Sequence, residues 1–154
     1  MRIWFDTEFI EDGRTIDLIS IGMVDEAGRT FYAESGEADL SRASPWVREN
    51  VLPHLLRSFS SRQEIAEGVQ AFAGASPQFW ADHAAYDWVA LCQLFGTMMD
   101  LPPGWPMFVR DIQQLWDTKG NPRLPVARRS VEHNALDDAL TCRDRWLFLT
   151  EAFT

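Results

Sequence analysis

Short apolar runs separated by turn residues dominate the first quarter of the chain. The first run, Ile3–Phe5, ends in two acids separated by one residue. Positions 16–24 mix β-branched and apolar residues, positions 25–29 have the composition of a turn, and an apolar stretch follows at 30–33. Such runs bounded by turn residues are typical of strands. The pattern predicts a three-stranded meander whose first strand ends at the acid pair.

Helical signals dominate the remaining sequence. Ser44-Pro45 predicts a helix start that Pro53 interrupts, and the capping-box sequence at 61–64 predicts a second helix ending near Gly74. We expect strands at 78–81 and 107–110 and helices at 84–95, at 112–116 and from about residue 134. There is no repeat and no long linker, so residues 1–154 are expected to form one domain. The predicted fold class is α/β, a mixed sheet flanked by helices.

Composition narrows the setting. A chain of 154 residues with 46% hydrophobic residues is large enough to bury a core. No apolar stretch approaches membrane-spanning length, and the first strand begins at once, without a signal peptide. The two cysteines, Cys92 and Cys142, form neither a disulfide framework nor a zinc site. We therefore expect a cytoplasmic protein. Seven tryptophans, among them Trp88, Trp105 and Trp116, are compatible with core packing or with a homodimer interface.

The net charge of −9 argues against a surface that grips a long duplex through its phosphates. One segment has the opposite charge: between Thr118 and Val131 there are four basic residues and no acid, namely Lys119, Arg123, Arg128 and Arg129. This segment leads into His133 and could guide phosphates, or it could be a solvated basic loop without a ligand. The scarcity of other basic clusters favours short single-stranded ends over long duplexes.

The acid pair Asp6 and Glu8 is the first chemical signal. Alternate residues of a strand point to the same face, so the two carboxylates should project together. They repel each other unless a cation or a shared proton neutralises them. The pair therefore predicts one half of a metal site.

Two later segments carry further acids. In 82–91, Asp87 lies in the first turn of the expected helix, where the dipole favours an anion; alternatively, Asp82 caps this helix and Asp87 is only a favourable first-turn acid. In 132–140, helical spacing places Asp138 on a stripe with Cys142 and Leu149, facing inward, and Asp137 on a more solvated stripe. A solvated acidic helix start with an incidental histidine is the alternative there. His133, next to the inward acid, suits proton transfer better than rigid metal ligation.

In order and spacing, the acids Asp6, Glu8, Asp87 and Asp138 together with His133 resemble the DEDDh family of 3′–5′ exonucleases, which has the ribonuclease H-like fold. The three blocks are Phe5–Phe9, the segment 82–91 and the segment 133–139, and they span nearly the whole chain. The third block, similar to H-x-A-x-x-D-A, also selects Asp138 over Asp137. The short chain and its Asp-Thr-Glu-Phe opening are similar to the small actinobacterial-type 3′–5′ exoribonucleases. Asp82-His83 departs from the usual His-Asn of the second block, and Tyr86 stands where phenylalanine is commoner.

The resemblance implies a two-metal phosphodiesterase that binds two Mg²⁺ or Mn²⁺ ions through the four acids. It assigns to His133 the removal of a proton from the attacking water, and to Glu8 and the backbone at Thr7 the terminal ribose. Phe9 could stack on the terminal base or belong to the core. Arg128 and Arg129 could contact phosphates. The expected partner is a single-stranded nucleic acid 3′ end, RNA in preference to DNA, and the product is a 5′-nucleotide. The alternatives are the same chemistry on DNA and a catalytically silent acidic binding module.

Overall fold

A six-stranded sheet forms the centre of the protein. The computed structural model describes residues 1–126 and 133–151. The sheet has the order β4-β3-β2-β1-β5-β6, with antiparallel pairing among β1, β2 and β3 and parallel pairing at both edges. The strands are β1 (Arg2–Glu11), β2 (Ile16–Asp25), β3 (Thr30–Ser35), β4 (Phe59–Ser60), β5 (Gln78–Ala81) and β6 (Arg110–Asp111). The predicted meander is confirmed.

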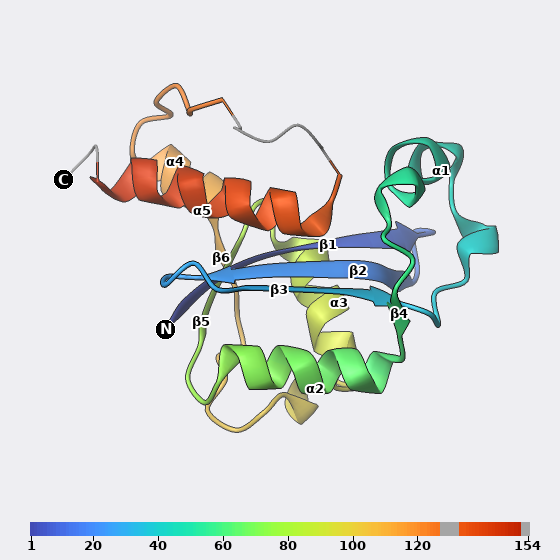
Figure 1. Ribbon diagram of the computed structural model, residues 1–154. Coiled ribbons are helices and arrows are strands. Elements are labelled where there is room, and N and C mark those ends of the chain that lie inside the picture. Colours follow the sequence, from blue (N-terminus) through green and yellow to red (C-terminus); the bar gives the residue numbers. More distant parts are fainter. Residues whose placement is uncertain (127–132, 152–154) are drawn as a thin grey trace.

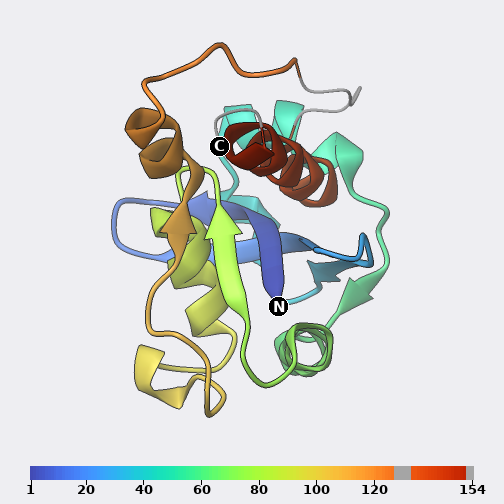
Figure 2. The same cartoon turned by 90° about the vertical axis from the view of Figure 1, so that its left-hand side faces the viewer.

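Helices cover both faces of this sheet. They are α1 (Pro45–Asn50), α2 (Arg62–Ala73), α3 (Ala85–Gln93), α4 (Ile112–Thr118) and α5 (Ala135–Glu151), with single 3₁₀ turns at Leu40–Arg42, Leu52–His54 and Met98–Asp100. Figure 1 shows α5 and α4 on one face and α2 and α3 on the other, with α1 at the far end of the sheet. Figure 2 shows the same layers along the strands. The predicted α/β class is confirmed, and the arrangement is compatible with a ribonuclease H-like fold.

The alternation of side chains along β1 divides them between the two layers. Ile3 and Phe5 are fully buried in the cluster under α2 and α3, whereas Trp4 belongs to the cluster under α5. By the same period of two, Asp6 follows Trp4 towards α5 and Thr7 follows Phe5 towards α3. The strand that carries the acid pair therefore serves both sides of the sheet.

Several expected boundaries were wrong. The first strand does not end at the acid pair but continues to Glu11. The strand expected at 107–110 is only Arg110–Asp111, and the two-residue strand β4 was not predicted. Strands this short bury too few side chains to leave a periodic signal, so their pairing with a neighbour defines them.

The tryptophans mostly serve the core. Trp88 and Trp105 are buried in the cluster under α2 and α3, and the half-buried Trp116 packs against the cluster under α5. Their indole groups are therefore packing groups within the fold. Among the residues that the structure describes, no helix combines the length and apolarity needed to cross a membrane.

Candidate active site

The two acids of β1 lie in the interior of the strand and face α5. Glu8 is only 9% exposed, and Asp6 is half-buried. The pairing of β1 with β2 shifts register between Glu8 and Phe9, the kind of irregularity that locally redirects side chains. The expectation that both carboxylates project from one face agrees with this geometry. The part of β1 that follows Glu8 was not predicted from the sequence, and it anchors the acid pair in the sheet on both sides.

A glycine beside the acid pair allows α5 to approach. Gly22 of β2 pairs with Asp6 across the sheet. A Cβ atom placed on Gly22 would lie 2.3 Å from backbone atoms of Ala135 and Leu136, a distance that real side chains do not tolerate. The missing side chain therefore lets the first turn of α5 rest directly on β2. This contact brings the acids of α5 to the acids of β1.

The start of α5 holds both the third acid and the histidine. The backbone N–H of His133 donates to Oδ2 of Asp138 at 3.0 Å. The side-chain oxygen of Asn134 accepts from the backbone N–H groups of Leu136 and Asp137. His133 has a left-handed backbone with φ of 63°, and its ring meets the ring of Trp46 edge-on at a centroid distance of 4.6 Å. Asp138, rather than Asp137, lines the cavity with Asp6.

The fourth acid connects α3 to β1. Oδ1 of Asp87 accepts hydrogen bonds from the backbone N–H of Thr7 at 2.9 Å and from its hydroxyl at 2.6 Å. Both bonds connect the sheet to α3. Both end on Oδ1, so neither involves Oδ2 of Asp87. Asp87 is therefore more than a favourable first-turn acid, because it fixes the position of the residue between Asp6 and Glu8.

The alternative that Asp82 caps α3 was wrong. Asp111, at the end of β6, accepts from the backbone N–H groups of His83 and Ala84, while Asp82 binds the side chains of Gln113 and Arg145. Figure 2 shows the ends of β5 and β6 side by side, from which these carboxylates come. Asp82 thus remains beside the site as an acid already paired with an arginine.

All the sequence-predicted site residues that the structure describes line one cavity of about 350 Å³. They are Asp6, Thr7, Glu8, Phe9, Asp87, His133 and Asp138. Arg128 and Arg129 lie outside the described residues. The same wall contains Trp46 and Tyr86, and the ring of Phe9 packs edge-on against that of Tyr86 at 5.9 Å. The sequence gave no reason to single out Trp46, whose 52% exposure is unusual for a tryptophan.

Burial and mutual repulsion dominate the electrostatics. Burial raises the pKa of Glu8 to about 8, with further contributions from Asp138 and Asp87. Burial and the neighbouring carboxylates, chiefly Asp87 and Glu8, hold the pKa of Asp6 well above its ordinary range. Burial raises the pKa of Asp87 to about 6 against the opposing effect of its bonds from Thr7. The protein thus concentrates carboxylates where each resists ionisation of the others.

This donor set fits a divalent cation. Within the described part of the chain, no hydrogen bond or ion pair compensates the carboxylate of Asp6 or of Glu8. One ligand atom each from Glu8, His133 and Asp138 lie within 4.8 Å of one another. Oxygen-rich sites suit Mg²⁺ and Mn²⁺. The tightest donor group includes His133, which the sequence had associated with proton transfer instead of ligation.

Comparisons with known proteins agree with this chemistry. Residues 1–150 match the family model described as the 3′–5′ exoribonuclease Rv2179c-like domain. Two curated relatives, the 3′–5′ exoribonucleases Rv2179c and MT2234.1 from two strains of Mycobacterium tuberculosis, are each 48% identical to this chain over 158 residues. These alignments cover 97% of this chain and 94% of each relative. A chain in the structure of the yeast NOT1 MIF4G domain co-crystallized with CAF1 aligns with a TM-score of 0.49 and 13% identity, over 97% of this chain and 80% of that one.

Family membership follows from the match over nearly the whole chain and from the level of identity. This chain belongs to the Rv2179c-like 3′–5′ exoribonuclease family and is a hydrolase that acts on RNA.

Proposed function

We propose that residues 1–154 form a single DEDDh-type exonuclease domain that removes nucleotides from the 3′ ends of single-stranded RNA and releases 5′-nucleotides. The observation that carries this proposal is the convergence of Asp6, Glu8, Asp87, Asp138 and His133 on one cavity. These residues come from β1, α3 and the start of α5, which are far apart in the sequence. The two free, buried cysteines favour the cytoplasm as the setting.

The four acids are the proposed ligands of two Mg²⁺ or Mn²⁺ ions. Bound ions of this kind stabilise the negative charge that develops on the attacking and leaving oxygens of a phosphodiester. Asp6 is central, because its carboxylate interacts electrostatically with each of the other three. Asp87 offers its second carboxylate oxygen while its first holds Thr7. Burial raises the pKa of Asp6, Glu8 and Asp87, so their ionised forms are costly in the interior and a bound cation would offset that cost.

His133 is the proposed general base. Its ring is held beside the cavity by the edge-on contact with Trp46, and its backbone is held by Asp138. From this position the imidazole accepts a proton from the water that attacks the terminal phosphate. One nitrogen of His133 lies within 4.8 Å of carboxylate oxygens of Glu8 and Asp138, which places the imidazole beside the proposed metal ligands.

The recognition of the terminal nucleotide rests on β1. Glu8 and the backbone at Thr7 are the proposed ribose contacts, and Phe9 is the proposed face for the terminal base. Phe9 is half-buried and lines the cavity while its ring packs against Tyr86, so it can serve the base and the packing together. Arg128 and Arg129 are proposed phosphate contacts on sequence grounds alone. RNA is the proposed substrate because the curated relatives are named exoribonucleases.

A cleavage assay tests the proposal. Single-stranded RNA and DNA with a 5′ label are incubated with the protein and Mg²⁺, Mn²⁺ or EDTA. We expect a ladder of 3′-shortened RNA that disappears with EDTA, with Asp6→Ala and with His133→Ala. His83→Ala is the matched control, because His83 also borders the cavity but is 79% exposed and paired with Asp82.

Other outcomes would reject parts of the proposal. Degradation of DNA alone would refute the substrate assignment, and internal RNA fragments would refute the exonucleolytic mode. Absence of cleavage under every metal condition would leave a binding module with this fold.

A further inference from the structure

Three cavities follow one another along α5. The cavity of the acids shares Asp6, His133 and Asp138 with a second cavity of about 290 Å³. That second cavity shares Thr141 and Arg145 with a third, of about 280 Å³. The path therefore begins at the carboxylates and continues beyond Arg145 without leaving the surface of α5.

One stripe of α5 forms the floor of this path. Asp138, Thr141, Arg145 and Phe148 are spaced by three or four residues, so they lie on the same side of the helix. Over the seven residues from Asp138 to Arg145 the helix rises about 10 Å. The chemistry along the stripe changes in order from an acid to a hydroxyl, then to a cation and finally to an aromatic ring.

The guanidinium of Arg145 is fixed by one ion pair, but not all of its N–H donors have a partner among the described residues. One guanidinium nitrogen pairs with Asp82, yet its buried Nε has no hydrogen-bond partner among the described residues. Arg2 and Arg143 also have a buried, unpartnered Nε, but their guanidinium groups lie over the rings of Trp146 and Trp4. Within the described part of the chain, no such ring contact accounts for Arg145. Its side chain is 30% exposed and lines both the second and the third cavity, so a guanidinium fixed by Asp82 can also meet an anionic ligand there.

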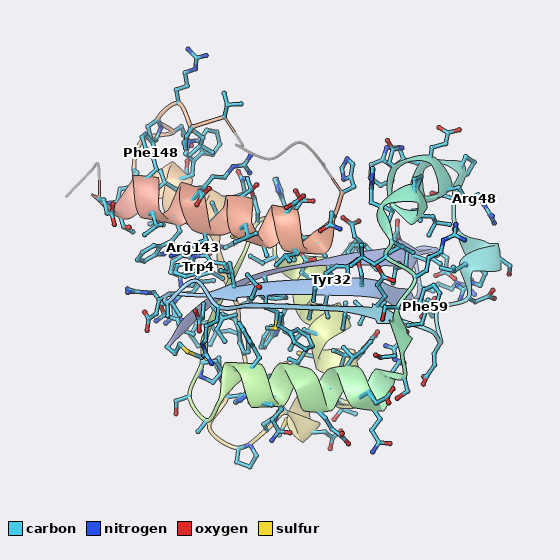
Figure 3. All side chains as sticks on the ribbon, in the orientation of Figure 1. Trp4, Tyr32, Arg48, Phe59, Arg143 and Phe148 are labelled. Atoms are coloured by element: carbon cyan, nitrogen blue, oxygen red, sulfur yellow. The ribbon has the colours of Figure 1, made fainter. Side chains whose placement is uncertain are left out.

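The third cavity has walls suited to a base and a ribose. Pro125, Val126 and Phe148 supply apolar surface, and Asp144 and Thr141 supply polar atoms. Figure 3 shows Phe148 on the side of α5 that faces the segment leading from α4 to Val126. Arg145 is the basic residue on the described wall of this cavity, so the anion belongs at Arg145 and the uncharged parts of a nucleotide belong beyond it.

We propose that this path binds the nucleotides on the 5′ side of the cleaved bond, with Arg145 contacting one of their phosphates. The inference rests on the proposed function, which assigns the opposite end of the acid cavity, at Phe9, to the 3′-terminal nucleotide. The strand must leave the acids in the other direction, and the path along α5 is continuous with them. Arg145 is thus a substrate-binding residue that makes cleavage depend on RNA length.

The test compares substrates with and without the 5′ segment. The p-nitrophenyl ester of uridine 5′-phosphate carries the cleaved phosphate but no nucleotide beyond it, whereas a pentaribonucleotide fills the path. Loss of Arg145 alone would leave Asp82 without its arginine partner beside Asp6, so the main variant is the double substitution Asp82→Asn, Arg145→Gln. Arg143→Gln, on the same helix but over Trp4, is the matched control.

Against Asp82→Asn alone, we expect kcat/KM for the pentaribonucleotide to fall roughly 10-fold to 100-fold in the double variant, as for the loss of one charge-assisted contact. The double variant should cleave the ester at the rate of Asp82→Asn, because the charge of Asp82 acts on Asp6, and Arg143→Gln should match wild type on both substrates. An equal loss on both substrates would mean that Arg145 acts only through the acid centre, and no loss on either would mean that it does not bind RNA. Each of these results overturns the inference.

A binding measurement separates this inference from the proposed function. If the wild-type protein cleaves neither substrate, the proposed function is wrong, and fluorescence anisotropy with a labelled pentaribonucleotide then decides the inference alone. Weaker binding by the double variant than by Arg143→Gln supports the path along α5. Equal binding by the two variants rejects it.

Discussion

The metal-free protein should be stabilised by removing the charge of Glu8. The pKa of this carboxyl group is about 8 in the folded protein against an ordinary value of 4.5. Because the folded state holds the proton more tightly than the unfolded chain, the folded state loses stability as the pH rises through this interval. The difference of about 3.5 pH units corresponds to about 5 kcal/mol at about 1.4 kcal/mol per unit. That is a large part of the stability of an ordinary domain, which is about 5–15 kcal/mol.

Glu8→Gln removes this titration and keeps the shape of the side chain. The assay is urea unfolding in EDTA at a series of pH values from 4.5 to 8. We expect the variant and the wild type to have similar unfolding free energies at pH 4.5, and the variant to be more stable by several kcal/mol at pH 8. The difference between the two proteins cancels the titration of groups that do not interact with Glu8, whereas Asp6, whose pKa Glu8 raises, contributes in the same direction. Glu11→Gln, at the exposed end of the same strand, reports what the loss of one surface charge does by itself.

The stability difference at pH 8 should narrow when Mg²⁺ or Mn²⁺ is added. A ligand at a hundred times its dissociation constant stabilises the folded state by about 2.7 kcal/mol, and the wild type should gain this more fully than Glu8→Gln. A stability difference between the two proteins that does not change with pH would refute the reasoning. It would mean that the charge of Glu8 is compensated within the folded protein and creates no demand for a cation.

Three further substitutions test how the site is assembled. Asp138→Asn should abolish cleavage of labelled RNA, whereas Asp137→Asn should retain it; equal effects would contradict the different placement of these neighbours. Gly22→Ala should cost about 1–3 kcal/mol in urea unfolding and also reduce kcat, because the new methyl group displaces the start of α5. Gly68→Ala, which instead meets a phenylalanine ring at 2.7 Å, should cost stability with little change in kcat. Thr7→Val removes a hydroxyl that donates to the α3 carboxylate, so kcat should fall while isothermal titration still detects metal binding; an unchanged kcat would show that this bond does not position the acids.

The sequence was sufficient where local rules decide structure. The alternation of apolar and polar residues in β1 assigned its side chains to two faces, and the capping-box residues Ser61 and Glu64 marked the start of α2 correctly. Helical spacing alone distinguished Asp138 from Asp137, because the apolar stripe of α5 has to face the sheet. These inferences need only the geometry of one element.

The tertiary structure decided everything that depends on two elements meeting. The strand that contains the acid pair is longer than expected, because its pairing with β2 continues past the acids. The turn that precedes α3 is held by Asp111, which is distant in the sequence but adjacent once β5 and β6 pair. The positions of Trp46 and Arg145 likewise follow from packing, which no local pattern encodes.

The sequence by itself thus determined the candidate site residues, because carboxylates spaced by strand and helix periods can be identified along the chain. Only the tertiary structure decided how they meet. Gly22 lets α5 touch the sheet, and Thr7 connects Asp87 to β1. The physical reason is that burial and repulsion act between side chains in space: the pKa of Glu8 rises to about 8 only when α5 and α3 close over β1.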